Sequence, residues 1–151
     1  MAAPSHTIVT TSKAPGPYPA LSQATVWNGM VFCSGSLGID PETKALVEGT
    51  IADRTVRVAY SHLGTLRTPT IPNLQSQTQA LTNLATILKE AGSGPEKVLK
   101  VMIYVTSISD VPLLNEAYVA FFPEPRPARA CVAVKELARG TDVEIECVGY
   151  I

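Results

Sequence analysis

The sequence predicts an α+β fold in which two helices pack on one face of a single mixed β-sheet. Three observations predict it: an Asn28-Gly29 turn between two apolar segments, an amphipathic helix followed by a strand-forming run, and a second helix before two alternating segments at the chain end. Helices and strands in this order favour one sheet covered on one side. A chain of 151 residues has the length of one domain, and we expect a single domain over residues 1–151.

The first predicted element is a β-hairpin over residues 24–35. Segments rich in β-branched and aromatic residues flank Asn28-Gly29, the dipeptide that most readily adopts the two positive φ angles of a type I′ turn. A turn at residues 40–43 follows, and the short apolar stretch 45–47 is a candidate third strand.

Apolar spacing predicts the two helices and the strand between them. The first helix carries a stripe with helical period, which ends before Gly92 and comprises Leu81, Leu84, Ala85, Leu88 and Ala91. Ser76 and Gln79 have the spacing of a capping box for this helix. Residues 97–106 contain a continuous run typical of a central strand. The second helix is expected to begin with a cap at Ser109 or Asp110 and to end before a proline-rich connection.

The last two strands, 129–134 and 143–150, alternate apolar residues with a second set of side chains. If these strands pair as an antiparallel hairpin, one face carries Arg129, Cys131, Glu144 and Glu146 and points away from the helices. A cross-strand ion pair on a solvated surface explains this pattern. A face covered by oligomerisation explains it too, and would place an Arg able to bind a carboxylate and a Glu able to hold a water in a cleft between subunits.

Composition excludes several functional classes. The 12 Lys and Arg residues against 13 Asp and Glu residues give a net charge of −1, which disfavours a nucleic-acid binder. No apolar run approaches the roughly 20 residues of a membrane span, and the N-terminal segment has no signal-peptide core. The three cysteines are widely spaced and suggest neither a disulfide framework nor a metal site. We expect a cytoplasmic protein, with a mitochondrial location also open.

The segment 56–77 does not fit the pattern around it. It has no sustained period, and it would be an uncommonly long loop in so small a domain. One hypothesis is a retained intron, because Val56-Arg57-Val58 can be encoded by a splice-donor-like string and a Gln codon can form an acceptor end. The alternative is a genuine insertion, which surface loops tolerate well. Transcript reads that run uniformly through this stretch would refute the intron.

The chain resembles the Rid (YjgF/YER) family of reactive-intermediate deaminases. The resemblance covers most of the chain outside the odd segment, and removing 56–77 joins its two sides in register with the family. It rests on seven motifs: Ser22-Gln23-Ala24, Asn28 to Gly35, Leu46 to Gly49, Gln79 to Leu84, Asn115-Glu116-Ala117-Tyr118, Pro127 to Val132 and Val143-Glu144-Ile145-Glu146.

The resemblance implies a chorismate-mutase-like fold that assembles as a homotrimer with clefts between subunits. It implies hydrolysis of reactive 2-imino and enamine acids, such as 2-iminobutanoate and 2-iminopropanoate, to 2-keto acids and ammonia without a cofactor. Pyridoxal-phosphate enzymes such as threonine dehydratase would supply the substrate. By the same resemblance Arg129 binds the substrate carboxylate, Glu144 positions the attacking water, and Cys131 and Asn115 line the cleft.

The family tyrosine that lines the cleft has two candidate positions here. An ungapped alignment puts Leu21 there, whereas Tyr18 takes the place if three residues loop out. A second departure is Ser36, where the family often has Gln. These departures leave open a non-enzymatic member that binds small carboxylates or acts as a chaperone.

Overall fold

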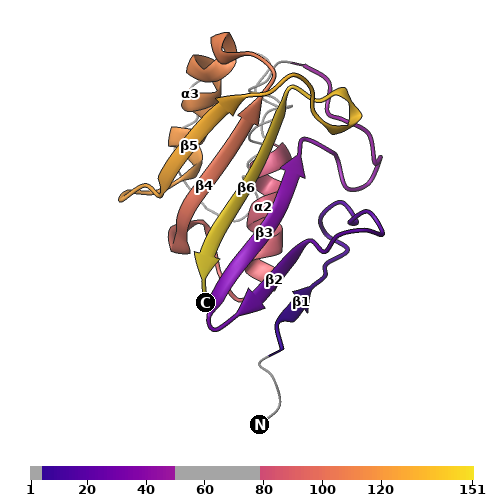
Figure 1. The fold of residues 1–151 in the computed structure, drawn as a ribbon, viewed down its shortest axis with the longest axis vertical. Coiled ribbons are helices and arrows are strands. Elements are labelled where there is room, and N and C mark those ends of the chain that lie inside the picture. The colour runs from indigo at the N-terminus through magenta and orange to yellow at the C-terminus, as the bar shows by residue number, and fades with distance from the viewer. Residues whose placement is uncertain (1–4, 50–78) are drawn as a thin grey trace, which may run out of the picture.

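The computed structural model describes residues 5–49 and 79–151 (Figure 1). The expected capping residue Ser76 and the segment 56–77 lie outside the described residues, so the intron hypothesis stays a prediction.

Six strands within the described residues form one sheet in the order β1-β2-β3-β6-β4-β5. Their bounds are β1 Thr7–Val9, β2 Ala24–Trp27, β3 Met30–Leu37, β4 Val98–Val105, β5 Ala128–Ala133 and β6 Val143–Tyr150. The helices α2 (Gln79–Glu90) and α3 (Val111–Phe121) lie behind this sheet in Figure 1. Because β4 and β5 run parallel and the other pairs antiparallel, the sheet is mixed, which confirms the predicted α+β class.

The hairpin is confirmed, but the third strand is not where we expected it. Asn28 and Gly29 both have positive φ angles, 50° and 77°, as a type I′ turn requires. The stretch 45–47 forms only an isolated bridge, from Leu46 to Ile39. The strand that pairs with β2 is instead β1, a three-residue strand at the edge of the sheet.

The stripe of α2 packs on the sheet as predicted. Leu81, Leu84 and Leu88 are fully buried, and the helix ends where Gly92 adopts a φ of 83°. The amide of Ser93 donates to the carbonyl of Leu88, which closes the C-terminal turn. The side-chain cap expected for α3 is absent among these residues, because Asp110 ends a short 3₁₀ turn with helical backbone angles and makes no capping bond.

The expected hairpin of the last two strands is wrong. Strand β6 lies between β3 and β4, and β5 pairs in parallel with β4 at the sheet edge. Arg129 and Cys131 sit opposite Val101 and Ile103, which are buried against the helices. Glu144 sits opposite Tyr104, on the other face. Arg129 and Glu144 therefore lie on opposite faces of the sheet in one chain.

Asn83 ties α2 to the loop after β3, and we expect its loss to destabilise the protein. Its Nδ2 donates to the carbonyls of Leu37 and Ile39, and its Oδ1 accepts from Gln79. Asn83→Ala leaves these buried groups without partners, which costs about 2–3 kcal/mol of unfolding free energy and lowers Tm by roughly 5–10 °C. Thermal unfolding followed by circular dichroism measures the loss. Thr86→Ala, one turn along α2, serves as the control, and an equal drop in both variants would contradict the prediction.

Candidate active site

One group of candidate residues lies between α3 and the edge strand β5. Arg129 and Cys131 are half-buried on the helix side of β5, and Asn115 and Tyr118 follow each other by one turn on α3. The Arg129 guanidinium lies over the Tyr118 ring, 4.5 Å from its centre. We call these four residues the arginine half-site.

The arginine half-site has unused polar groups. Among the described residues, the Oδ1 of Asn115 and the hydroxyl of Tyr118 are buried and have no hydrogen-bond partner, and Tyr118 as a whole is only 3% exposed. Within the described residues no carboxylate pairs with Arg129. Burial raises the pKa of the Cys131 thiol, against a smaller lowering by Arg129, so this cysteine stays neutral. A planar cation with free donors on an aromatic ring is suited to hold a carboxylate.

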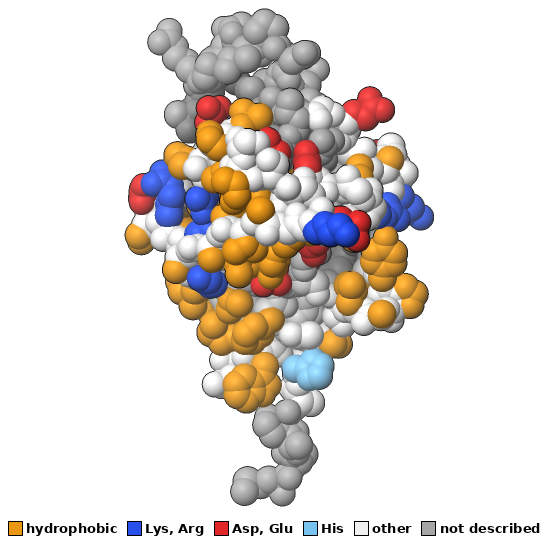
Figure 2. Space-filling model, turned by 45° about the horizontal axis from the view of Figure 1, so that its top comes forward, with side chains coloured by type: hydrophobic (Ala, Val, Ile, Leu, Met, Phe, Trp, Pro, Cys, Tyr) orange, Lys and Arg blue, Asp and Glu red, His pale blue; other side chains and the backbone are white. Residues whose placement is uncertain are grey.

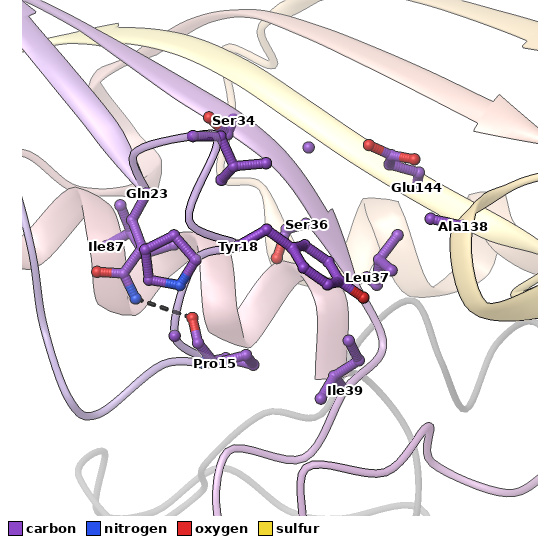
Figure 3. Close-up of a pocket in the computed structure, with 14 residues that line it drawn as sticks. Pro15, Tyr18, Gln23, Ser34, Ser36, Leu37, Ile39, Ile87, Ala138 and Glu144 are labelled. Carbon is purple, nitrogen blue, oxygen red and sulfur yellow. Dashed lines mark hydrogen bonds between the residues drawn. The ribbon is translucent and has the colours of Figure 1, made fainter.

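The second group surrounds a pocket of about 160 Å³ at the end of β3. Figure 3 shows Tyr18, Leu37 and Glu144 around it; Leu21 and Ser34 also line it. Both candidates for the family tyrosine, Tyr18 and Leu21, thus lie at this pocket. We call it the glutamate half-site.

Gly35 makes room for the Glu144 carboxylate. The β3–β6 register shifts between Cys33 and Ser36, so Gly35 lies at a bulge-like irregularity within strand β3. A Cβ at Gly35 would overlap the Glu144 carboxylate. The glycine is therefore part of the site, which its place in the sequence motif alone did not reveal.

The environment of Glu144 favours its protonated form. Burial raises the pKa of Glu144, and the charge of Glu146 raises it further. Glu146 itself accepts a hydrogen bond of 3.4 Å from the Tyr104 hydroxyl on β4. Glu144 is thereby poised to exchange a proton nearer to neutral pH than an ordinary Glu.

Tyr18 is held by a residue that sequence reasoning missed. The Nε of Arg139 donates to the Tyr18 hydroxyl at 2.8 Å, and another of its nitrogens donates to the carbonyl of Lys44. Arg139 lies in the connection between β5 and β6, where its φ is 59°, and no sequence motif around it indicates this contact. Tyr118 had a detectable signal, because it follows Asn115 at the i+3 spacing that places two side chains on one helix face.

The two half-sites do not meet within one chain. Arg129 pairs with Val101, which pairs with Cys147, and Glu144 precedes Cys147 by three positions. With strands about 4.8 Å apart and a rise of about 3.3 Å per residue, the Cα atoms of Arg129 and Glu144 are roughly 14 Å apart. Their side chains also leave opposite faces of the sheet. A small substrate can contact both only if they come from different chains.

The face of the sheet opposite the helices carries exposed apolar side chains. Trp27, Phe32 and Val132 point to this side, and hydrophobic side chains gather in patches on the surface shown in Figure 2. Exposed patches of this kind mark association surfaces.

Within residues 5–49 and 79–151, no group of three or more His, Cys, Asp or Glu side chains is placed to hold a metal ion. The helices of these two ranges also lack the length and apolar character of a membrane span.

Comparison with known proteins places the chain in a family. The family described as endoribonuclease L-PSP matches residues 64–151. The human protein 2-iminobutanoate/2-iminopropanoate deaminase is 32% identical over 141 residues, which are 93% of this chain and 87% of that protein. An Entamoeba histolytica structure titled a putative endoribonuclease L-PSP has a TM-score of 0.79 at 33% identity, covering 97% of this chain and 100% of that one. RidA from an Antarctic Psychrobacter has a TM-score of 0.77 at 35% identity, covering 96% and 99%. The chain belongs to the Rid family.

Proposed function

We propose that this protein hydrolyses reactive 2-imino and enamine acids to 2-keto acids and ammonia. The observation that carries the proposal is Arg129: its guanidinium is half-buried on the Tyr118 ring and has no carboxylate partner among the described residues. The names of the human and rat relatives, both 2-iminobutanoate/2-iminopropanoate deaminases, support this reaction class. The near-neutral charge of the chain gives no support to binding of RNA.

The active form in this proposal is a homotrimer with its sites between subunits. Two features support it: the half-sites lie on opposite faces of one chain, and the open face of the sheet exposes apolar side chains. Assembly around a closed symmetry axis covers that face and brings a different surface of each subunit into every contact. Each cleft then combines Arg129 of one subunit with Glu144 of the partner subunit.

The chemistry requires few groups. Arg129, with Asn115 and Cys131 beside it, holds the substrate carboxylate, and Tyr18 lines the opposite wall. Glu144 accepts a proton from a water as the water oxygen bonds to the imine carbon. It returns that proton to the nitrogen, which gives a carbinolamine. Glu144 then transfers the hydroxyl proton of the carbinolamine to the nitrogen, so that the carbonyl of the 2-keto acid forms as the carbon–nitrogen bond breaks and ammonia leaves. Because an imine also hydrolyses in water, orientation and electrostatics are sufficient for the catalysis.

The substrate in this proposal comes from enzymes that release enamines, among them pyridoxal-phosphate enzymes such as threonine dehydratase. The test follows from that link. The protein is mixed with threonine dehydratase, threonine and semicarbazide, which traps the free imine. We expect a lower semicarbazone yield with the wild type and no reduction with Arg129→Ala. An equal reduction with both proteins, or none with either, would refute the reaction. Carboxylate binding without turnover would instead support the non-enzymatic alternative.

The activity is expected to fall on acidification, with an apparent pKa above the roughly 4.3 of an ordinary Glu. The reason is that burial and the Glu146 charge raise the pKa of Glu144, whereas the reaction uses its carboxylate form. Glu146→Gln removes one of the two causes and should move the acid limb of kcat/KM to lower pH. The pH profile measures this, with the exposed Glu42→Gln as control. An acid limb that Glu146→Gln leaves in place would contradict the prediction.

The same shift has a consequence for stability. Because the folded pKa lies above the unfolded one, Glu144 contributes stability that is fully present below the unfolded pKa and is lost as pH rises through the folded pKa. Glu144→Gln should therefore raise Tm at neutral pH while it removes activity.

A further inference from the structure

The pocket of the glutamate half-site offers a substrate little besides apolar walls. Leu21, Leu37, Ile39 and Ile87 contribute to its lining. Two of the polar side chains in the same wall are engaged elsewhere: Gln23 exchanges hydrogen bonds with the backbone of Thr11 and donates to Pro15, and the Ser34 hydroxyl donates to the carbonyl of Ser22. The side-chain carboxylate of Glu144, by contrast, has no hydrogen-bond partner among the described residues.

We propose that this pocket takes the side chain of the substrate and makes the protein selective for 2-imino acids with a branched aliphatic or phenyl side chain. The inference rests on the proposed function, which assigns the reacting carbon to the vicinity of Glu144. In this arrangement Arg129 of the partner subunit binds the substrate carboxylate, and the reacting carbon lies near Glu144. The side chain of the imino acid then occupies the pocket beside Glu144.

Size and polarity select this substrate class. A cavity of about 150 Å³ accommodates benzene, and this pocket has about 160 Å³. A methyl or ethyl side chain would leave most of it to water, whereas an isobutyl or benzyl group fills it. A polar substrate side chain would lose hydrogen bonds to water, and the wall side chains of Gln23 and Ser34 are already engaged.

Leu21 is the residue that sets the limit. It lines the pocket and is 48% exposed, so its side chain can be changed without disturbing the core. Tyr18, on the same loop, has its hydroxyl bonded to Arg139. The loop thus presents a leucine to the substrate side chain.

The experiment compares imines of increasing size. They are generated in place by an amino-acid oxidase from alanine, 2-aminobutyrate, leucine and phenylalanine, and semicarbazide competition gives kcat/KM for each. We expect the leucine-derived imine to exceed the alanine-derived one by at least about tenfold, the lower bound for added methylenes in an apolar pocket. Leu21→Trp should reduce that ratio by at least about tenfold, with the alanine-derived imine still hydrolysed. Leu99→Trp, a change at an equally exposed leucine outside the lining, should leave the ratio unchanged.

A binding measurement separates this inference from the proposed function. Titration calorimetry measures the Kd of two keto acids, which bind without turnover. The isobutyl group of 4-methyl-2-oxopentanoate would fill the pocket, whereas the methyl group of pyruvate would leave it mostly empty. Tighter binding of the larger keto acid, weakened by Leu21→Trp, supports the pocket assignment even if no imine is hydrolysed. Hydrolysis of all imines at similar kcat/KM, or a size preference that Leu21→Trp leaves unchanged, would overturn the assignment while the reaction stands.

Discussion

Mixed trimers of Arg129→Ala and Glu144→Gln chains are expected to recover about one third of the wild-type activity, although either variant alone is nearly inactive. In each homotrimer every cleft lacks one of its two charged groups. Loss of one partner of a desolvated charged contact costs about 2–5 kcal/mol, or roughly 30- to 5,000-fold in kcat/KM. Each mixed trimer, in either ratio, contains one cleft in three with an intact Arg129 and an intact Glu144 of the partner subunit.

The measurement uses two affinity tags, one on each variant, and co-expression. Tandem purification isolates trimers that contain both chains, and semicarbazide competition measures their activity. Co-expression of two differently tagged Arg129→Ala chains is the control, which should show no recovery. Mixed trimers as inactive as the control would contradict a site shared between subunits. A monomeric mass in solution would do the same, because one chain keeps the two groups on opposite faces of its sheet.

The sequence was sufficient for most of the helices and strands, but not for β1 or for the order in which the strands pair. The hairpin at Asn28-Gly29 and the helix stripe ending at Gly92 depend on local backbone preferences and on periodicity, and both are confirmed. The order of strands depends on long-range contacts. Alternation correctly separated Arg129 and Cys131 from their neighbours on β5, but which set faces the helices depends on the parallel pairing with β4.

In the candidate site, too, the sequence predicted individual residues but not the contacts between distant parts of the chain. Family motifs pointed to Arg129, Asn115, Cys131 and Glu144, and the structure gathers the first three beside α3 while it places Glu144 at the other half-site. What sequence reasoning could not supply are contacts that depend on three-dimensional proximity. Arg139 reaches Tyr18 from a turn 121 residues away, and no local pattern encodes that contact.

Gly35→Ala is expected to lower kcat/KM by about 100-fold while Tm changes by no more than a few degrees. A Cβ at Gly35 would overlap the Glu144 carboxylate, which must then move. The carboxylate is the far end of a flexible side chain, so the fold accommodates the methyl group at small cost. The reaction does not, because a displacement of about 1 Å of a catalytic group costs roughly 10²-fold in rate.

Gly94→Ala provides a matched control for this prediction. A Cβ at Gly94 would also press on a carboxylate, that of Glu96, but this pair lies in the turn before β4 and outside both half-sites. Both glycines therefore test the same steric change, and only Gly35 tests it at the site. If Gly35→Ala retains full activity, the position of the Glu144 carboxylate over this glycine is not the one used in the reaction. If Gly94→Ala loses as much activity as Gly35→Ala, the loss reflects the fold and not the placement of Glu144. If only Gly35→Ala loses activity and both variants are equally stable, the reaction depends on the position of the Glu144 carboxylate, which the absence of a side chain at Gly35 allows.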